Sequence, residues 1–347
     1  MTKKLLFITP IFPRNTTEDN VVPFISQFTQ KFEKDKDAKI DIITLMYPFS
    51  KETYTLGNLT VYALGGNFKK KHKKIPLLSK AILKGIQLCK KNKYDGVLCF
   101  WYREAALVGK VLSLFFNLKL LVWLQGQDAK IENSYVHFLR ISANNLVMIS
   151  NKQKKLFNAN FNTNVQKVAN LAISKSIFPT LNKGHRKIDI LGVGNLGALK
   201  NYSLFVDIVS ELKLKNVRAV ICGQGEEFDL LQKKVEQLKL TENIKLLGIV
   251  SNQKVLEHMN NTKVFLHTST FEGGATVIQE ALFSGCQVVS TIEIDDNNIE
   301  NFYYSSNKVD LVEKTKSILL ASTEPKRVEN FKIKDTINEI YNHFYNA

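Results

Sequence analysis

The sequence is poor in cysteine and proline, and it has no long uninterrupted apolar run. Four cysteines in 347 residues lie far apart, and none forms a C-x-x-C pair. This spacing excludes a disulfide framework and a zinc-finger type of metal site. Seven prolines and 17 glycines are too few for a long disordered or low-complexity tract. The most apolar stretch, residues 106–124, contains glycine, asparagine and two lysines, so we expect no membrane span.

The first residues only faintly resemble a signal peptide. Residues 1–8 are partly apolar, but Pro10, Pro13 and Arg14 interrupt the run early, and no small-residue cleavage site follows. Because disulfides and processing signals are both missing, we expect a cytoplasmic protein with reduced thiols.

Acidic residues are scarce in the first half of the chain. Residues 1–175 contain 28 Lys and Arg but 11 Asp and Glu, whereas residues 176–347 contain 20 and 21. The positive excess of the whole chain, +16, therefore comes from the first half. Such an asymmetry predicts that this half meets an anionic partner.

The most basic segment is K-K-K-H-K-K at residues 69–74. One interpretation is a solvated loop. The alternative is a contact with an anionic membrane surface or an anionic acceptor, since each lysine near an anionic leaflet contributes about 1 kcal/mol. The lysines concerned are Lys69, Lys70, Lys71, Lys73 and Lys74. No aromatic residues interleave with them and no recognition motif accompanies them, so we expect no nucleic acid partner.

Apolar runs of strand length alternate with segments of helical periodicity along the chain. In the first half, strands are expected at 4–10, 39–46, 59–64, 95–101, 118–124 and 146–149, and helices at 21–34, 77–90, 104–116, 135–143 and 152–158. In the second half, strands are expected at 188–193, 219–222, 244–247, 264–268 and 288–290, and helices at 202–212, 228–238, 254–259 and 275–283. This alternation predicts an α/β fold with parallel sheets and right-handed crossovers.

The alternation divides into two Rossmann-like domains, residues 1–175 and 176–330, with a polar connection between them. Ligands of such sheets bind at the carboxyl ends of the strands, so we expect both domains to face a central cleft. Residues 331–347 are expected to form a C-terminal helix, for which a return to the N-terminal domain is one option.

The pattern G-V-G-N-L-G at residues 192–197 matches the G-x-G-x-x-G of dinucleotide folds. That match requires an acidic residue about 20 residues further on, at the end of the next strand. The next strand is followed by C-G-Q-G at 222–225, which has no carboxylate. We therefore expect neither NAD nor any other cofactor.

The most specific segment is T-F-E-G-G-A-T-V-I-Q-E-A at residues 270–281. Glycines and the open N–H groups of a helix start favour a phosphate or a sugar. Glu280, expected about two turns inside an apolar helix, needs a partner, and ligand hydroxyls are suitable donors. The alternative interpretation is a glycine turn with two solvated glutamates. His267, near this segment, is expected to be structural, and the histidines show no metal-ligand spacing.

Glu272 and Glu280, with seven residues between them, resemble the E-x7-E signature of family 4 retaining glycosyltransferases, which adopt the GT-B fold. Segments between residues 187 and 291 resemble further motifs of this family in the same order: V-G-N-L at 193–196 with Lys200, C-G-Q-G-E at 222–226, L-L-G-I-V at 246–250 and S-G-C-Q-V-V at 284–289. In the first half, L-Q-G-Q-D at 124–128 resembles the H-G-x-D loop of the family less closely.

The resemblance implies metal-independent transfer of a sugar, with retention, from a UDP- or GDP-sugar to a glycan or lipid-linked acceptor in cell-surface polysaccharide biosynthesis. Glu272 and the neighbouring amides would hold the sugar, Glu280 the ribose hydroxyls and Lys200 the diphosphate. The implied catalytic residues are Glu272, Lys200, Asn195, Gln125 and Asp128. The implied donor-binding residues are Gly194, Gly223, Gly225, Ile249, Val250, Gly273, Gly274, Ala275, Thr276 and Glu280.

Several positions depart from the family pattern, among them E-G-G-A at 272–275 in place of E-G-F-G, and two of them change the charge chemistry. Asn195 replaces an arginine, so Lys200 has to neutralise the diphosphate with less help, and Gln125 replaces a histidine, so it cannot carry a proton. Two other functions remain open. A sugar-nucleotide 2-epimerase on the same fold would need a carboxylate and histidine acid–base set. A non-enzymatic protein that binds anionic surfaces would explain the charge but not the E-x7-E segment. An enzyme acting on lipid-linked acceptors is expected at the inner face of the membrane.

Overall fold

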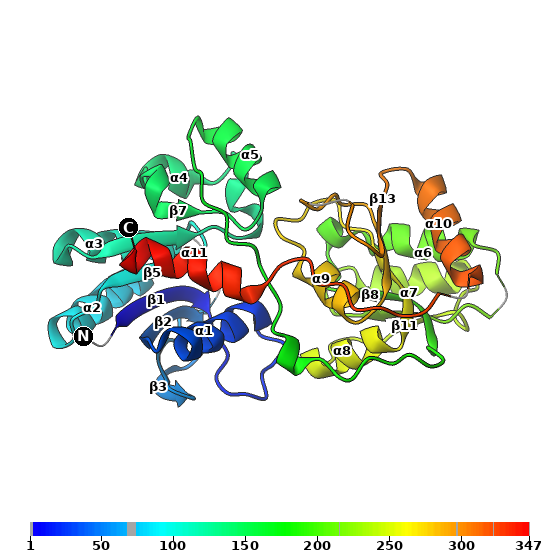
Figure 1. Cartoon of the computed structure of the whole chain (residues 1–347), viewed down its shortest axis with the longest axis horizontal. Helices are drawn as coiled ribbons and strands as arrows, with labels where there is room; N and C mark the ends of the chain where they lie inside the picture. Colours follow the sequence, from blue (N-terminus) through cyan, green and yellow to red (C-terminus); the bar gives the residue numbers. More distant parts are fainter. Residues whose placement is uncertain (1–2, 68–73, 215, 296–297, 322, 347) are drawn as a thin grey trace. The chain divides into compact units, whose positions relative to one another are not determined.

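The computed structural model describes residues 3–67, 74–214, 216–295, 298–321 and 323–346. The chain forms two compact units, Met1–Ala172 with Lys332–Ala347 (unit 1) and Ile173–Phe331 (unit 2) (Figure 1). Within the described ranges, no helix combines the length and apolarity needed to cross a bilayer.

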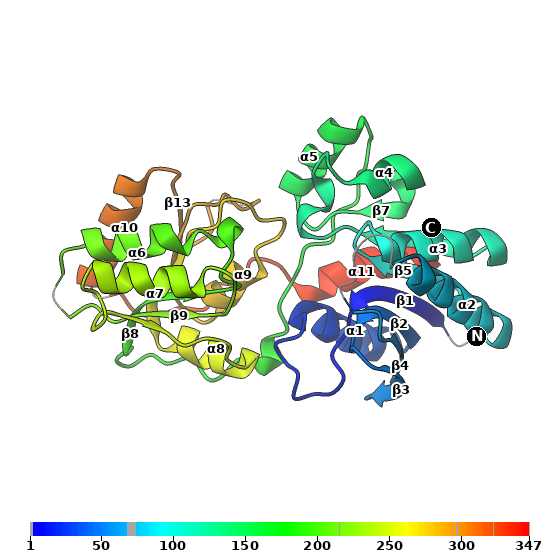
Figure 2. The ribbon, with the colours of Figure 1, turned by 180° about the vertical axis from the view of Figure 1, so that it is seen from behind.

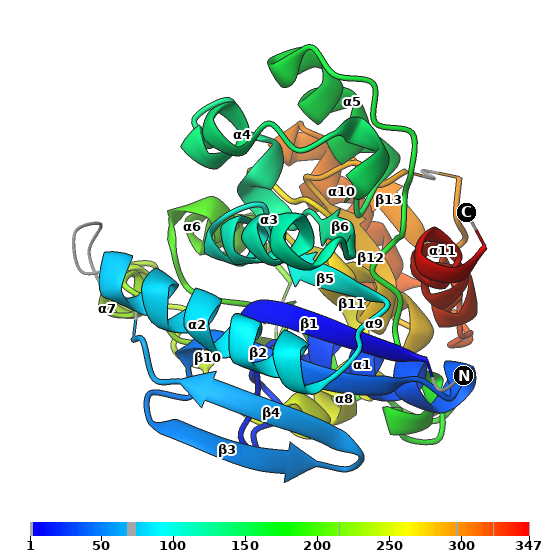
Figure 3. The same cartoon turned by 90° about the vertical axis from the view of Figure 1, so that its left-hand side faces the viewer.

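Unit 1 contains a seven-stranded sheet with the order β3-β4-β2-β1-β5-β6-β7. Its strands are β1 (Lys4–Ile11), β2 (Lys39–Tyr47), β3 (Lys51–Leu56), β4 (Leu59–Leu64), β5 (Gly96–Phe100), β6 (Lys119–Trp123) and β7 (Leu146–Val147). All neighbours are parallel except β3 and β4, which form an antiparallel hairpin at the edge (Figure 3). The sequence did not predict β3, because its half-exposed K-E-T-Y-T-L run lacks the apolar signal of a central strand.

Helices cover both faces of this sheet. They are α1 (Pro23–Lys36), α2 (Ile75–Lys91), α3 (Glu104–Phe116), α4 (Ser134–Leu139), α5 (Asn151–Phe161) and α11 (Ile333–Tyr345). Helices α2, α3, α4 and α5 contribute to one apolar core, and α1 and α11 to the other. The helix expected over 135–143 ends early, because Arg140 takes a left-handed conformation with φ +45°. Ser150 caps α5, with its hydroxyl accepting the Gln153 N–H at 3.0 Å.

Unit 2 contains a six-stranded parallel sheet with the order β10-β9-β8-β11-β12-β13. Its strands are β8 (Ile188–Val193), β9 (Ala219–Cys222), β10 (Ile244–Leu246), β11 (Thr262–His267), β12 (Gln287–Ser290) and β13 (Phe302–Tyr304). Helices α6 (Tyr202–Glu211), α7 (Phe228–Gln237) and α10 (Lys308–Leu320) cover one face, and α8 (Asn252–Asn260) and α9 (Thr276–Phe283) the other (Figure 2). The sequence did not predict β13 or α10.

Helix α11 brings the end of the chain back to unit 1, where Figure 1 shows it in red among blue and cyan elements. Its apolar face buries Ile337, Ile340 and Phe344. The His343 ring contacts the carbonyl oxygen of Leu120 through Nε2 at 2.8 Å. The helix therefore completes the second apolar core of unit 1.

Substitution of Phe344 by alanine tests this packing. We expect Phe344→Ala to lower the free energy of unfolding of unit 1 by about 3 kcal/mol, because it removes a buried aromatic ring and leaves a cavity. The exposed Lys334 on the same helix provides the control, and Lys334→Ala should change stability by less than about 0.5 kcal/mol. Urea denaturation measures both. Equal stabilities of the two variants would contradict a supporting role for α11.

Candidate active site

Glycine-containing loops meet at the carboxyl ends of β8 and β9. Gly194 donates its N–H to the carbonyl of Cys222 at 3.0 Å, and Gly223 donates to the carbonyl of Gly248 at 2.8 Å. Gly223 has φ +154°, and a Cβ atom there would lie 1.8 Å from the carbonyl oxygen of Gly194. A larger residue would force the loops apart, so glycine is required at Gly223 for the backbones to pack.

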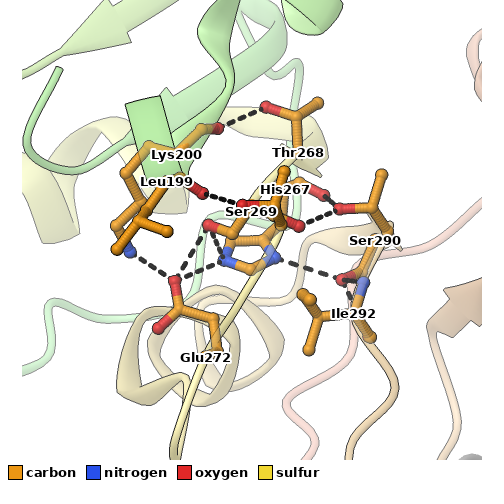
Figure 4. Close-up of polar contacts among 10 residues, drawn as sticks. Leu199, Lys200, His267, Thr268, Ser269, Glu272, Ser290 and Ile292 are labelled. Atoms are coloured by element: carbon orange, nitrogen blue, oxygen red, sulfur yellow. Dashed lines mark hydrogen bonds and ion pairs between the residues drawn. The ribbon is translucent and has the colours of Figure 1, made fainter. Parts of the chain in front are cut away.

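Lys200 and Glu272 come together at this edge of the sheet. Lys200 ends the short 3-10 helix Ala198–Lys200 that follows β8, and Glu272 lies in the loop that follows β11. The two loops are joined by hydrogen bonds from Thr268 Oγ1 to the Lys200 carbonyl at 3.0 Å and from the Thr270 N–H to the Leu199 carbonyl at 2.8 Å. The ammonium of Lys200 forms an ion pair with Oε1 of Glu272 (Figure 4).

Glu272 is ionised despite its partial burial. Burial raises the pKa of this carboxyl, but the contact with His267 and the charge of Lys200 outweigh it, and the pKa falls to about 2. The carboxylate therefore acts as a fixed acceptor of hydrogen bonds rather than as a proton donor.

His267, the last residue of β11, contacts Glu272 directly. Its Nε2 lies 3.3 Å from Glu272 Oε1 and 3.1 Å from Ser269 Oγ, and its Nδ1 lies 3.1 Å from Ser290 Oγ (Figure 4). Burial lowers the pKa of His267, and the nearby carboxylate opposes this. The sequence predicted only a structural histidine here. A signal was present, because strand ends in such sheets point to the ligand side.

Glu280 is the fifth residue of α9, so it lies about one turn inside the helix rather than the two that the sequence predicted. Its carboxyl is 8% exposed and forms a hydrogen bond with Asn252, at the start of α8. Burial raises the pKa of Glu280 to about 7. Hydroxyl groups of a ligand that donate to this carboxyl would favour its ionised form.

The other expected residues of unit 2 lie in the same group of loops. Ala275 precedes α9 with φ +30°, and Gly273 and Gly274 connect it to Glu272. Asn195 is exposed in the loop after β8, and Ile249 is 69% exposed in the loop after β10. The structure thus places Thr276 and Glu280 in α9 and the other predicted residues in the segments that follow β8, β9, β10 and β11: Gly194, Asn195, Lys200, Gly223, Gly225, Ile249, Val250, Glu272, Gly273, Gly274 and Ala275.

Gln125 and Asp128 lie in unit 1, around the 3-10 helix Gly126–Ala129 that follows β6. Asp128 is fully buried, and its Oδ2 accepts the N–H groups of Gln125 at 2.9 Å and Tyr102 at 2.8 Å. Burial raises the pKa of Asp128 to about 6, although these bonds and Arg103 oppose it. Asp128 therefore joins the loops after β5 and β6, and the catalytic roles of Gln125 and Asp128 stay predictions.

A pocket of about 560 Å³ opens beside Asp128 in unit 1. Trp101, Arg103, Glu104 and Lys74 are among the residues that line it. Lys74 is the one lysine of the predicted basic segment within the described residues, and its ammonium lies 2.5 Å from Glu104 Oε1. This ion pair corrects the prediction that Lys74 is available to an anionic surface. Lys69, Lys70, Lys71 and Lys73 lie outside the described residues.

Among the residues described, no three His, Cys, Asp or Glu side chains lie close enough together to hold a metal ion.

The whole chain has the fold of GT-B glycosyltransferases. Sucrose-phosphate synthase from Thermosynechococcus elongatus matches it with a TM-score of 0.75 at 12% identity, over 99% of this chain and 95% of that one. The Anabaena protein HepE, solved with UDP and glucose, matches with a TM-score of 0.67 at 15% identity, over 99% and 95%. Each unit contains the strand–helix alternation and the parallel pairing that the sequence predicted, apart from the antiparallel β3–β4 pair of unit 1.

Residues 174–299, which lie within unit 2, match the family Glycosyl transferases group 1. One subunit of human phosphatidylinositol N-acetylglucosaminyltransferase is 29% identical over 43% of this chain and 32% of its own length. A Campylobacter jejuni enzyme, N-acetylgalactosamine-N,N'-diacetylbacillosaminyl-diphospho-undecaprenol 4-alpha-N-acetylgalactosaminyltransferase, is 35% identical over 29% of this chain and 27% of its own. The similarity thus spans about a third or less of these curated relatives.

Replacement of Glu280 by glutamine tests the buried carboxyl. The folded pKa of about 7 exceeds the ordinary 4.5, so the native state loses stability as the pH rises from 4.5 past 7. Glu280→Gln should therefore unfold at the same urea concentration as the wild type near pH 4.5 and be more stable by up to about 3 kcal/mol at pH 8, without nucleotide. The exposed Glu236→Gln serves as the control. A difference that does not depend on pH would contradict the assignment.

Proposed function

We propose that this protein is a retaining, metal-independent glycosyltransferase that moves a sugar from a UDP- or GDP-sugar to a glycan or lipid-linked acceptor in cell-surface polysaccharide biosynthesis. The observation that carries the proposal is the grouping of Lys200 and Glu272 on adjoining loops, with Glu280 in the helix α9 that follows, at the carboxyl edge of the unit 2 sheet. The family match covers this edge. The UDP bound by HepE and the diphospho-undecaprenol named for the Campylobacter relative support the substrate classes.

In the proposed reaction, each side chain has a role set by its charge and burial. The ammonium of Lys200 stabilises the negative charge that develops on the leaving diphosphate, and such preorganised charge is usually a large catalytic contribution. The ionised Glu272 accepts hydrogen bonds from hydroxyls of the transferred sugar. The Glu280 carboxyl accepts those of the ribose. Asn195 supplies no charge, so Lys200 carries most of this stabilisation.

The sites disfavour the two alternatives. An epimerase needs an acid–base pair that reaches a sugar carbon. His267 and Glu272 are in contact, but both ring nitrogens of His267 already face protein atoms and its side chain is 3% exposed. A protein that only binds anionic surfaces would have no use for a buried Glu280 beside a glycine-rich helix start.

Lys200→Ala should lower turnover about 100-fold or more, because little other positive charge is assigned to the diphosphate. Release of UDP or GDP from a panel of nucleotide sugars measures this, and the exposed Lys245→Ala serves as the control. Near-normal turnover of Lys200→Ala would show that another cation acts.

Activity should persist in EDTA, and NMR of the product should show the anomeric configuration of the donor. Loss in EDTA restored by Mn²⁺ would disprove the metal-independent mechanism.

We also propose a cytoplasmic location at the inner face of the membrane, held by the basic N-terminal half. Replacement of Lys69, Lys70, Lys71 and Lys73 by glutamine should reduce sedimentation with anionic vesicles and leave donor hydrolysis unchanged. Lys74 is kept, since it pairs with Glu104. Four exposed lysines of unit 2, Lys233, Lys239, Lys245 and Lys316, form the matched control.

Binding of the wild type to anionic vesicles should weaken towards about 0.5 M salt, where the Debye length falls well below 10 Å. Equal partition of the wild type between neutral and anionic vesicles would exclude this location.

A further inference from the structure

One oxygen of Glu272 lies within reach of three polar groups. Oε1 contacts the ammonium of Lys200 and lies 2.9 Å from Oγ of Ser269 and 3.3 Å from Nε2 of His267 (Figure 4). Lys200 lies in the segment that follows β8 and His267 ends β11, and both contact this single atom. The resting site therefore places its diphosphate-binding cation on a carboxylate of the protein itself.

A bound diphosphate would compete for this cation. Under the proposed function, the ammonium of Lys200 turns from Glu272 to the phosphate oxygens. The side chain of Glu272 is only 17% exposed, so water cannot fully replace the lost charge. A partly buried carboxylate that loses its cation is strongly destabilised unless another donor compensates.

The hydrogen bonds around Ser290 determine which nitrogen of His267 carries a proton. Ser290 Oγ accepts the N–H of Ile292 at 2.9 Å and donates to the carbonyl of Ile292 at 3.0 Å. Because its single proton is given to that buried carbonyl, Ser290 faces Nδ1 as an acceptor, and Nδ1 carries a hydrogen. In the neutral ring, Nε2 is then bare and accepts the hydroxyl of Ser269 at 3.1 Å.

Protonation of Nε2 would rearrange these bonds. An Nε2–H group would point towards Glu272 Oε1, and Ser269 would turn its hydroxyl from Nε2 to the same carboxylate, to which it already lies within hydrogen-bond distance. One proton taken from solvent thus gives Glu272 two donors in place of Lys200. Nδ1 would keep its bond to Ser290 throughout.

We infer that His267 is a positioning residue that holds Glu272 in place when Lys200 moves to the diphosphate, and that it takes up one proton in this exchange. The inference rests on the proposed function, since it requires a diphosphate at Lys200. His267 does not touch substrate in this arrangement. It keeps Glu272 ionised and oriented towards the sugar.

The charges around His267 act in the required direction. The charged groups that face it are Glu272, from the loop after β11, and Lys200, from the loop after β8, while β12 presents the neutral Ser290. Phe265, two residues earlier on β11, is apolar and stacks with the ring at 6.4 Å. Burial and Lys200 lower the pKa of His267, and Glu272 raises it. Because the charge of Lys200 lowers the pKa of His267, its departure raises that pKa, and the negative charge of a diphosphate raises it further. Both changes favour the protonated ring.

NMR of protein labelled with ¹⁵N-histidine tests the inference. The signals of His267 are assigned by their loss in His267→Gln, and UDP and GDP are the probes. On addition of the nucleotide that binds, the Nε2 signal of His267 at pH 7 should shift from the range of a bare ring nitrogen to that of a protonated one. The signals of His137 and His343, both in unit 1, should stay unchanged. Nucleotide binding with an unchanged His267 signal would overturn the inference and leave the proposed function intact.

A second variant tests the exchange without nucleotide. In Lys200→Met the cation is absent, so His267 should already be protonated at pH 7, and a bare Nε2 in this variant would overturn the inference. If His267→Gln fails to fold, Lys200→Met and Ser290→Ala, which removes the partner of Nδ1, provide the assignment.

Turnover of the wild type should fall at high pH as His267 loses its proton, and His267→Gln should lack this decline. Failure of both nucleotides to bind in calorimetry would instead reject the proposed function together with the inference.

Discussion

The site of unit 2 depends on the ion pair between Lys200 and Glu272. It joins the loop after β8 to the loop after β11. Hydrogen bonds from the Thr268 hydroxyl and the Thr270 N–H to backbone carbonyls hold the same two loops together. Since these strands are neighbours in a parallel sheet, their carboxyl ends deliver the two side chains to one point. The pair is partly buried, so its charges interact strongly and a competing anion has a large effect on them.

The same physical rule places charge in unit 1, with a different result. There Asp128 is fully buried and bonded to backbone amides, and Lys74 is paired with Glu104 at the edge of a pocket. These charges are compensated within the protein. The positive excess of the first half therefore does not come from Lys74, whose charge is paired with Glu104.

Glu272 and Glu280 belong to one motif, but their different partners give their carboxyls different pKa values. Glu272 has a cation and a histidine as partners, and its pKa falls to about 2. Glu280 has Asn252 and no such cation, and its pKa rises to about 7. Near neutral pH Glu272 is therefore ionised, which suits a permanent charge. Glu280, eight positions further on, is more readily protonated, which suits a carboxyl whose ionisation changes when ligand hydroxyls bind.

The sequence by itself determined the α/β class, most central strands and the E-x7-E segment, because apolar periodicity and glycine spacing are local properties of the chain. It missed β3, whose residues are mostly polar and half-exposed, β13, whose three residues F-Y-Y form too short a run, and α10, whose apolar residues follow no clear helical period. Only the tertiary structure decided that Lys200 lies on Glu272, that His267 bridges Glu272 and Ser290, and that Lys74 pairs with Glu104. Apart from the contact of His267 with Glu272, these contacts join residues that are not close along the chain. Strand order and side-chain burial create them, and no local pattern encodes strand order or burial.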